Sequence, residues 1–233
     1  MRQIILDTET TGLDPALGHR VIEIAGVELV SRRLTGKHFH RYLNPGRDIE
    51  EGALQVHGLT VEFLRDKPGF EEIVDEFLDY VAGAELVIHN APFDVGFLDH
   101  ELGLARRPPI SQYCPAVTDT LRMAREIHPG KKNSLDALCE RYQVDHSART
   151  LHGALLDAQL LAEVYLAMTR GQESLAIEIA PLHVGESAAE FTAAELDLVV
   201  LRASDEELAA HLQALAEIEK ASGGACLWKR LGA

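Results

Sequence analysis

Three segments rich in strand-forming residues follow one another at the start of the chain, and strand-like and helix-like patterns alternate after them. The first three cover residues 3–8, 20–30 and 36–43, with turn signals at Thr11-Gly12 and Thr35-Gly36. Because they follow so closely, they predict an antiparallel meander. Further strands are predicted at 85–89 and near 114–118, and helices at 50–56, 70–82, 120–127, 134–142 and 153–169. This order predicts an α/β fold with a mixed central sheet flanked by helices.

Local signals mark where several of these elements begin and end. Gly83 fits the C-cap of the helix over 70–82. Pro92 opens a helix in its first turn, and Asp119 is suited to cap the helix over 120–127. The helix over 70–82 carries its apolar side chains at helical spacing, namely Phe70, Ile73, Val74, Phe77, Leu78 and Val81.

The composition changes after Gly171. Residues 172–194 are rich in Ala and Glu with weak periodicity, which indicates a linker, and residues 196–202 are strand-like. Ser204 and Glu207 form a predicted capping box, and Gly223-Gly224 precede an exposed-looking end. The predicted organisation is a domain at 1–171, a linker at 172–194 and a C-terminal segment at 195–233.

The charge balance excludes some classes of protein. The formal net charge is −15, whereas a nonspecific nucleic-acid coat protein or a polybasic membrane-surface protein would be basic. Three scattered cysteines favour a reducing compartment over a disulfide framework. No apolar run approaches the ~18 residues of a membrane span, and Met1–Gln3 leads straight into the strand-like run. We therefore expect a cytosolic protein without a signal peptide.

Asp7 and Glu9 stand at the end of the first, otherwise apolar strand. Side chains two residues apart point to the same face of a strand, so the two carboxylates lie together. Like charges so close repel, and a divalent metal ion is the natural way to offset the repulsion. The alternative is a pair of solvated carboxylates at an exposed strand end.

Further candidates follow later elements. Asp94 lies in the first turn of the helix after the strand at 85–89, where an ordinary first-turn acid is the alternative. His152 and Asp157 do not share a face of an ideal helix, so we place His152 in the preceding loop and Asp157 on the helix, both facing one cavity. His57 ends the helix at 50–56 and is expected in a loop.

Four carboxylates on three separate elements, with a histidine among them, point to a metal-dependent reaction. All-oxygen carboxylate sites suit Mg²⁺ or Mn²⁺ better than Zn²⁺. Two such ions ~4 Å apart can hold the attacking and leaving oxygens of a phosphodiester displacement. A histidine can take the proton of the attacking water. The expected chemistry is metal-assisted phosphoryl hydrolysis.

The motifs resemble a known family. Asp-x-Glu-Thr-Thr-Gly, the His-Asn-x-x-Phe-Asp block and the terminal His-x4-Asp resemble the three exonuclease motifs of the DEDD superfamily, in its histidine-bearing (DEDDh) branch. The chain is also similar, over residues 3–171, to the epsilon proofreading subunits of bacterial DNA polymerase III. Closely matching segments lie at 56–58, 83–90, 133–139 and 150–159. The resemblance implies a ribonuclease H-like exonuclease fold.

The resemblance also implies roles for the site residues. Asp7, Glu9 and Asp157 would bind two Mg²⁺ or Mn²⁺ ions and contact the substrate, Asp94 would support the second ion, and His152 would be the general base. Thr10 and His57 would contact the terminal nucleotide. Phe93 would lie beside the frayed bases, with core packing as the alternative. Gly52 stands where relatives often carry an acid, so either Glu51 substitutes for that acid or Gly52 offers only its backbone.

The C-terminal part implies partners. Gln172, Leu175 and Ile177 resemble a segment that binds the beta sliding clamp, although Ile177 stands where an aromatic residue is often found. The alternative is an ordinary helix extension. Cys226, Leu227 and Trp228 resemble the tail that binds the polymerase alpha subunit, and an exposed Trp fits an interface anchor. The alternative is that Trp228 packs on the helix over 204–221.

These expectations lead to one main hypothesis and two alternatives. The main one is a 3′→5′ exonuclease of the bacterial replisome that removes mispaired nucleotides from single-stranded or frayed DNA ends. One alternative is a free-standing exonuclease that trims DNA or RNA. The other is an inert scaffold between clamp and polymerase, against which the intact set of acidic motif residues weighs.

Overall fold

The computed structural model describes residues 1–147, 149, 151–170, 203–224 and 228. The chain divides into two units, Met1–Ala176 and Ile177–Ala233, and each is described by itself. The predicted linker at 172–194 and strand at 196–202 lie outside the described residues. So do Gln172, Leu175, Ile177, Cys226 and Leu227.

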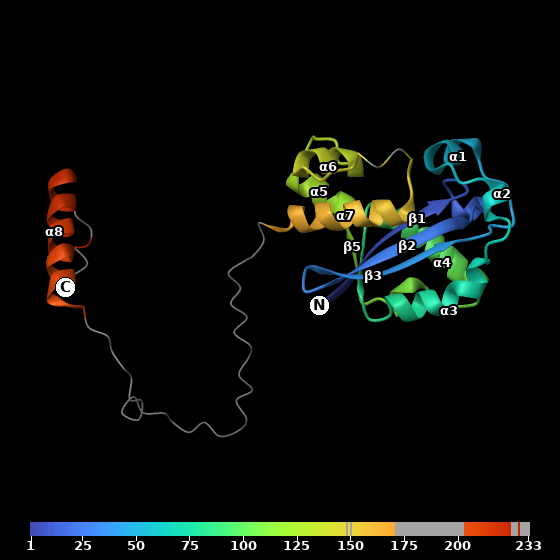
Figure 1. Cartoon of the computed structure of the whole chain (residues 1–233), viewed down its shortest axis with the longest axis horizontal. Coiled ribbons are helices and arrows are strands. Elements are labelled where there is room, and N and C mark those ends of the chain that lie inside the picture. The colour runs from blue at the N-terminus through green and yellow to red at the C-terminus, as the bar shows by residue number, and fades with distance from the viewer. Residues whose placement is uncertain (148, 150, 171–202, 225–227, 229–233) are drawn as a thin grey trace, which may run out of the picture. The chain divides into compact units, whose positions relative to one another are not determined.

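The first unit is built on a five-stranded mixed sheet, as predicted (Figure 1). Its strands are β1 (Arg2–Thr10), β2 (Val21–Val30), β3 (Arg33–Tyr42), β4 (Glu85–Ile88) and β5 (Ala116–Asp119), in the order β3-β2-β1-β4-β5. Strand β1 pairs antiparallel with β2 and parallel with β4, so it occupies the middle of the sheet.

The turn between β2 and β3 is not where the sequence predicts it. Ser31 and Arg32 form the loop, with φ of 48° and 62°, because Val30 pairs with Arg33. A two-residue loop with positive φ at both positions matches the twist of a hairpin. The Arg32 side chain is held by hydrogen bonds to Leu166 O and Thr169 Oγ1. The turn expected at Thr35-Gly36 is therefore wrong; Gly36 lies inside β3, where the register shifts.

Helices cover both faces of the sheet. They are α1 (Glu51–His57), α2 (Val61–Leu64), α3 (Phe70–Val81), α4 (Ala91–Leu104), α5 (Thr120–Ile127), α6 (Leu135–Tyr142) and α7 (Ala154–Met168). On one face Ile4 and Leu6 of β1 pack with α3 and α4, and on the other Ile5 packs with α6 and α7 (Figure 1). Alternation along β1 thus divides the core into two layers. Helix α2, which the sequence did not predict, is a single turn capped by Thr60.

Helix boundaries follow the local signals closely. All the apolar side chains predicted for the face of α3 are buried. Its C-cap is Ala82, one residue before the predicted Gly83, which follows with φ of 70°. Asp119 caps α5 as predicted and accepts hydrogen bonds from the backbone N–H groups of Leu121 and Arg122.

The described part of the second unit is α8 (Asp205–Ala221) with Trp228. The predicted capping box is present, since Ser204 and Glu207 each accept a hydrogen bond from the other's backbone. Trp228 is 69% exposed. Within the described ranges, no helix is long and apolar enough to cross a bilayer.

Candidate active site

Strand β1 places Asp7 and Glu9 at its carboxyl end. Asp7 pairs with Ala25 and Glu9 with Glu23 on β2, and the register shifts directly after Glu9. Glu23 is a further buried acid next to Glu9, and its carboxylate lies 2.7 Å from Nε2 of His40. The two carboxylates of the first motif therefore stand on the central strand, in acidic surroundings.

Helix α4 brings Asp94 to the same place. The chain leaves β4 through Asn90, whose φ of 70° turns it sharply into the helix. Asp94 then lies in the first turn, is buried, and accepts a hydrogen bond of 2.7 Å from the hydroxyl of Thr8. Because Thr8 is the residue between Asp7 and Glu9, this bond joins the second motif to the first.

His152 and Asp157 reach the site from the α6–α7 connection and from α7. Asp157 is in the first turn of α7, and His152 precedes the N-cap Gly153. The backbone N–H of His152 donates to Val56 O at 3.1 Å, which ties this loop to α1. One ligand atom each of Glu9, His152 and Asp157 lie within 4.8 Å of one another. The expected arrangement, with His152 in a loop and Asp157 on a helix, is present.

Burial dominates the electrostatics of these acids. Burial and the neighbouring acids Asp94 and Glu9 raise the pKa of Asp7 well above its usual value. Burial, followed by the charge of Asp157, raises the pKa of Glu9 to about 8. Burial also raises the pKa of Asp94 to about 7, against the hydrogen bond from Thr8. Such a set of buried carboxylate oxygens fits Mg²⁺ or Mn²⁺, whose charge would stabilise the ionised acids.

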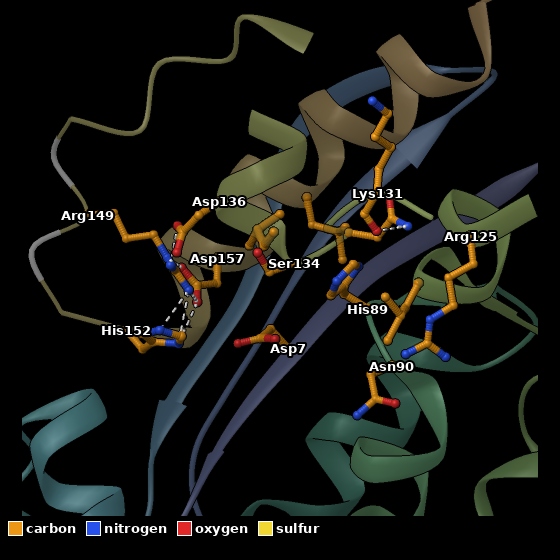
Figure 2. Close-up of a pocket in the computed structure, with 14 residues that line it drawn as sticks. Asp7, His89, Asn90, Arg125, Lys131, Ser134, Asp136, Arg149, His152 and Asp157 are labelled. Carbon is orange, nitrogen blue, oxygen red and sulfur yellow. Dashed lines mark hydrogen bonds and ion pairs between the residues drawn. The ribbon is translucent and has the colours of Figure 1, made fainter. Parts of the chain in front are cut away.

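Arg149 is a site residue that the sequence analysis missed. Its Nε and Nη2 atoms each lie 2.6 Å from an oxygen of Asp157, and the guanidinium also pairs with Asp136 of α6 (Figure 2). Nη2 lies 3.0 Å and 3.2 Å from the ring nitrogens of His152. A single Arg in a loop gives no sequence signal of its own; the sole clue is its position three residues before His152.

A cavity of about 550 Å³ opens beside these groups (Figure 2). Asp7, Asp157, His152 and Arg149 lie at one side of it, and His89, Asn90, Arg125 and Lys131 at the other. The cavity therefore joins the acids to a basic wall formed by Arg125 of α5 and Lys131. His89 is half-buried there and its Nδ1 lies 3.0 Å from the hydroxyl of Thr120.

The residues expected to contact the terminal nucleotide do not line this cavity. The hydroxyl of Thr10 donates to Gly12 O at 2.6 Å, and Phe93 packs against Phe97 with ring centroids 5.0 Å apart. Gly52 is exposed on α1 with open space around it. His57 is the last residue of α1, not a loop residue, and is buried; its Nδ1 accepts from Leu59 N–H. Its Nε2 is buried without a hydrogen-bond partner among the described residues.

Comparison with known proteins shows the family of the chain. The Exonuclease family model matches residues 4–165. DNA polymerase III subunit epsilon of Salmonella typhimurium is 54% identical over 238 residues, which cover 98% of this chain and 97% of the relative. The Escherichia coli subunit is 53% identical over 242 residues, again covering 98% and 97%. The chain belongs to the DNA polymerase III epsilon subunit family.

As a member of the epsilon family, the chain is a 3′→5′ exonuclease that proofreads during DNA replication. Solved structures agree on the fold. A structure of exonuclease X in complex with 5′ overhanging duplex DNA is 26% identical, has a TM-score of 0.57, and covers 75% of this chain and 94% of that one. The exonuclease fold expected for this epsilon family member is thus confirmed.

Proposed function

We propose that the chain removes mispaired 3′-terminal nucleotides of DNA by two-metal catalysis at the site described above. The observation that carries the proposal is the convergence of Glu9, His152 and Asp157 within 4.8 Å from a strand, a loop and a helix. Asp7 stands two residues before Glu9 on the same strand, and Asp94 is hydrogen-bonded to Thr8 between them.

In this proposal Asp7, Glu9 and Asp157 hold two Mg²⁺ or Mn²⁺ ions, and Asp94 supports the second. When bound, the ions supply charge that stabilises the attacking and leaving oxygens of the scissile phosphate. The protein contributes the fixed positions of the carboxylates. Asp7 and Glu9 are fixed by strand pairing, and Asp157 by its place in the first turn of α7.

His152 acts as the general base in this scheme. It is 46% exposed, so water and substrate can reach its ring. Burial and the charge of Arg149 lower the pKa of its imidazole. The ring therefore stays neutral at physiological pH, and it can take a proton from the attacking water.

The substrate is a single-stranded or frayed 3′ end. Glu9, Asp94 and Asp157 are buried and Asp7 is half-buried, so a base-paired terminus cannot bring its phosphate among them. A mismatch lowers the cost of fraying, and this favours mispaired ends. His57 and Thr10 would contact the terminal nucleotide, Phe93 would lie beside the frayed bases, and Gly52 would offer its backbone unless Glu51 makes that contact.

The tail would hold the chain at the replication fork. Gln172, Leu175 and Ile177 would bind the beta sliding clamp, and Cys226, Leu227 and Trp228 the polymerase alpha subunit. The exposure of Trp228 supports an anchor that a partner buries. Such a protein would work in the cytoplasm, at the nucleoid.

Replacing Asp7 tests the proposal. We expect Asp7→Asn to reduce Mg²⁺-dependent digestion of single-stranded DNA by about 10³-fold or more, because metal stabilisation of the transition state is worth several kcal/mol. Asp79→Asn, at an exposed acid of α3, is the matched control and should digest normally. Circular dichroism and thermal melting show whether each variant is folded. Undiminished digestion by a folded Asp7→Asn chain would contradict the mechanism.

A further inference from the structure

Arg149 makes contacts that the proposed reaction does not explain. Its guanidinium is only 6% exposed and is forked onto the carboxylate of Asp157, which is 4% exposed. Among the described residues, Arg149 is the one Lys or Arg that forms an ion pair with Asp7, Glu9, Asp94 or Asp157. The buried guanidinium of Arg149 is therefore the positive charge that is paired with these acids.

The carboxylate of Asp157 is also one of the groups that could hold a metal ion. Oδ1 and Oδ2 of Asp157 each accept a hydrogen bond of 2.6 Å from Arg149. A carboxylate held in this way points its lone pairs at the guanidinium. A divalent ion placed between Glu9, His152 and Asp157 would face the guanidinium charge at close range, and the two cations would repel each other.

Arg149 also contacts the ring of His152. The Nη2 atom that bonds Oδ2 of Asp157 lies within 3.2 Å of both ring nitrogens of His152. A guanidinium can only donate, and an atom this close to both ring nitrogens lies over the face of the imidazole and not along a nitrogen lone pair. The guanidinium therefore covers part of the general base. Asp136 of α6, paired with Nη1, gives the guanidinium a further partner outside the metal position.

We propose that Arg149 and the metal ion are alternative partners of Asp157, so that the ion displaces the guanidinium and in doing so frees His152. Arg149 is then a positioning residue: it holds the carboxylate of Asp157 in place until the ion replaces it. The inference rests on the metal site of the proposed function, but it concerns an arginine that the metal chemistry itself does not require.

Mn²⁺ binding to the full chain, measured by isothermal titration calorimetry, tests the exchange. We expect Arg149→Gln to bind Mn²⁺ roughly tenfold tighter than the wild type, the scale on which one neighbouring charge shifts a partly buried equilibrium. Arg149→Lys should fall between the two, because it keeps a charge but cannot fork. In EDTA, Arg149→Gln should have a lower melting temperature than the wild type. Mn²⁺ should raise the melting temperature of Arg149→Gln by more than it raises that of the wild type.

Arg20→Gln is the matched control. Arg20 forks onto buried Glu101 at 2.8 Å and 2.7 Å and does not line the catalytic cavity. This variant should melt lower without any change in Mn²⁺ affinity. If a folded Arg149→Gln chain binds Mn²⁺ only as tightly as the wild type, or less tightly, the proposed exchange is wrong. The proposed metal site would not be affected by that result. Absence of Mn²⁺ binding to the wild type would overturn the proposed metal site, and the exchange with it.

Discussion

At the scale of single residues, the site contains acids whose ionised forms are destabilised by burial. Asp7, Glu9 and Asp94 all have raised pKa values, chiefly because they are buried. The fold therefore holds these side chains in place at a cost in stability. Their types and spacing were predictable from the motifs. Arg149, which offsets part of the cost, was not, because its acidic partners Asp157 and Asp136 lie eight and thirteen residues away along the chain.

This cost predicts an unusual pH dependence. In the metal-free protein the folded state holds protons on Glu9 and Asp94 up to about pH 8 and pH 7, whereas the unfolded chain releases them near its ordinary pKa values. The folded state then binds more protons, so the free energy of unfolding falls as pH rises from about 4.5 to 8. Melting temperatures in EDTA across this range measure the effect.

Glu9→Gln serves as the companion variant, since it removes one such acid. It should flatten the decline and raise the melting temperature in EDTA at pH 8. Glu163→Gln, at an exposed acid of α7, should leave the decline as it is. A wild-type protein whose stability rises from pH 5 to pH 8 in EDTA would show that the acids are not destabilising.

At the scale of elements, the site depends on where helices begin. Asp94 and Asp157 both lie in first turns, of α4 and α7. Asp119 caps α5 and also accepts a hydrogen bond from the N–H of Asn90, which joins two helix starts. Such caps are local signals and were predictable. The β2–β3 turn was not, because Ser31-Arg32 is a poor turn sequence held by contacts to α7 and to Thr169 just after it.

The basic wall of the cavity belongs to this scale as well. Arg125 of α5 and Lys131 face the acids across the cavity. We expect Arg125→Ala and Lys131→Ala to raise KM for single-stranded DNA with little change in kcat, because phosphate contacts position a strand without taking part in the reaction. DNA binding weakens as the salt concentration rises. For each variant the slope of log K against log salt concentration should be shallower by about one, the share of one phosphate contact.

Arg122→Ala is the control on the same helix. Arg122 pairs with Glu126 and lies outside the cavity. It should change neither KM nor the salt dependence. If Arg125→Ala and Lys131→Ala instead lower kcat at unchanged KM, the wall acts on the reaction and not on the strand.

At the scale of the whole molecule, the mixed sheet flanked by helices was predicted from the order of strand-like and helix-like segments, whereas the order of the strands and the two core layers were not. The convergence of Glu9, Asp94, His152 and Asp157 was foreseen from motifs, whereas the exact partners were not. Patterns are local, but a pair such as Thr8–Asp94 joins residues 86 positions apart. A contact between two residues so far apart in the sequence depends on tertiary packing, which sequence periodicity does not record.

The formal charge of −15 also acts at this scale. A surface this acidic predicts weak binding to DNA by the chain alone, and a tether to the polymerase would offset it by raising the effective concentration. We expect Trp228→Ala to lose binding to the polymerase alpha subunit in surface plasmon resonance, with unchanged digestion of single-stranded DNA. Removal of residues 222–233 should do the same. A wild-type chain that does not bind the polymerase would favour a free-standing trimming enzyme.

The central place of β1 gives the two halves of the site different backbone support. Strand β1 is hydrogen-bonded on both sides, so the amide protons of Ile4 and Ile5 can exchange with solvent only when the sheet itself opens. His152 and Arg149 stand on the irregular connection before α7, whose backbone link to α1 is the bond from His152 to Val56. The carboxylates of β1 are therefore held by the sheet itself, while the general base is held by a loop and its hydrogen bond to α1.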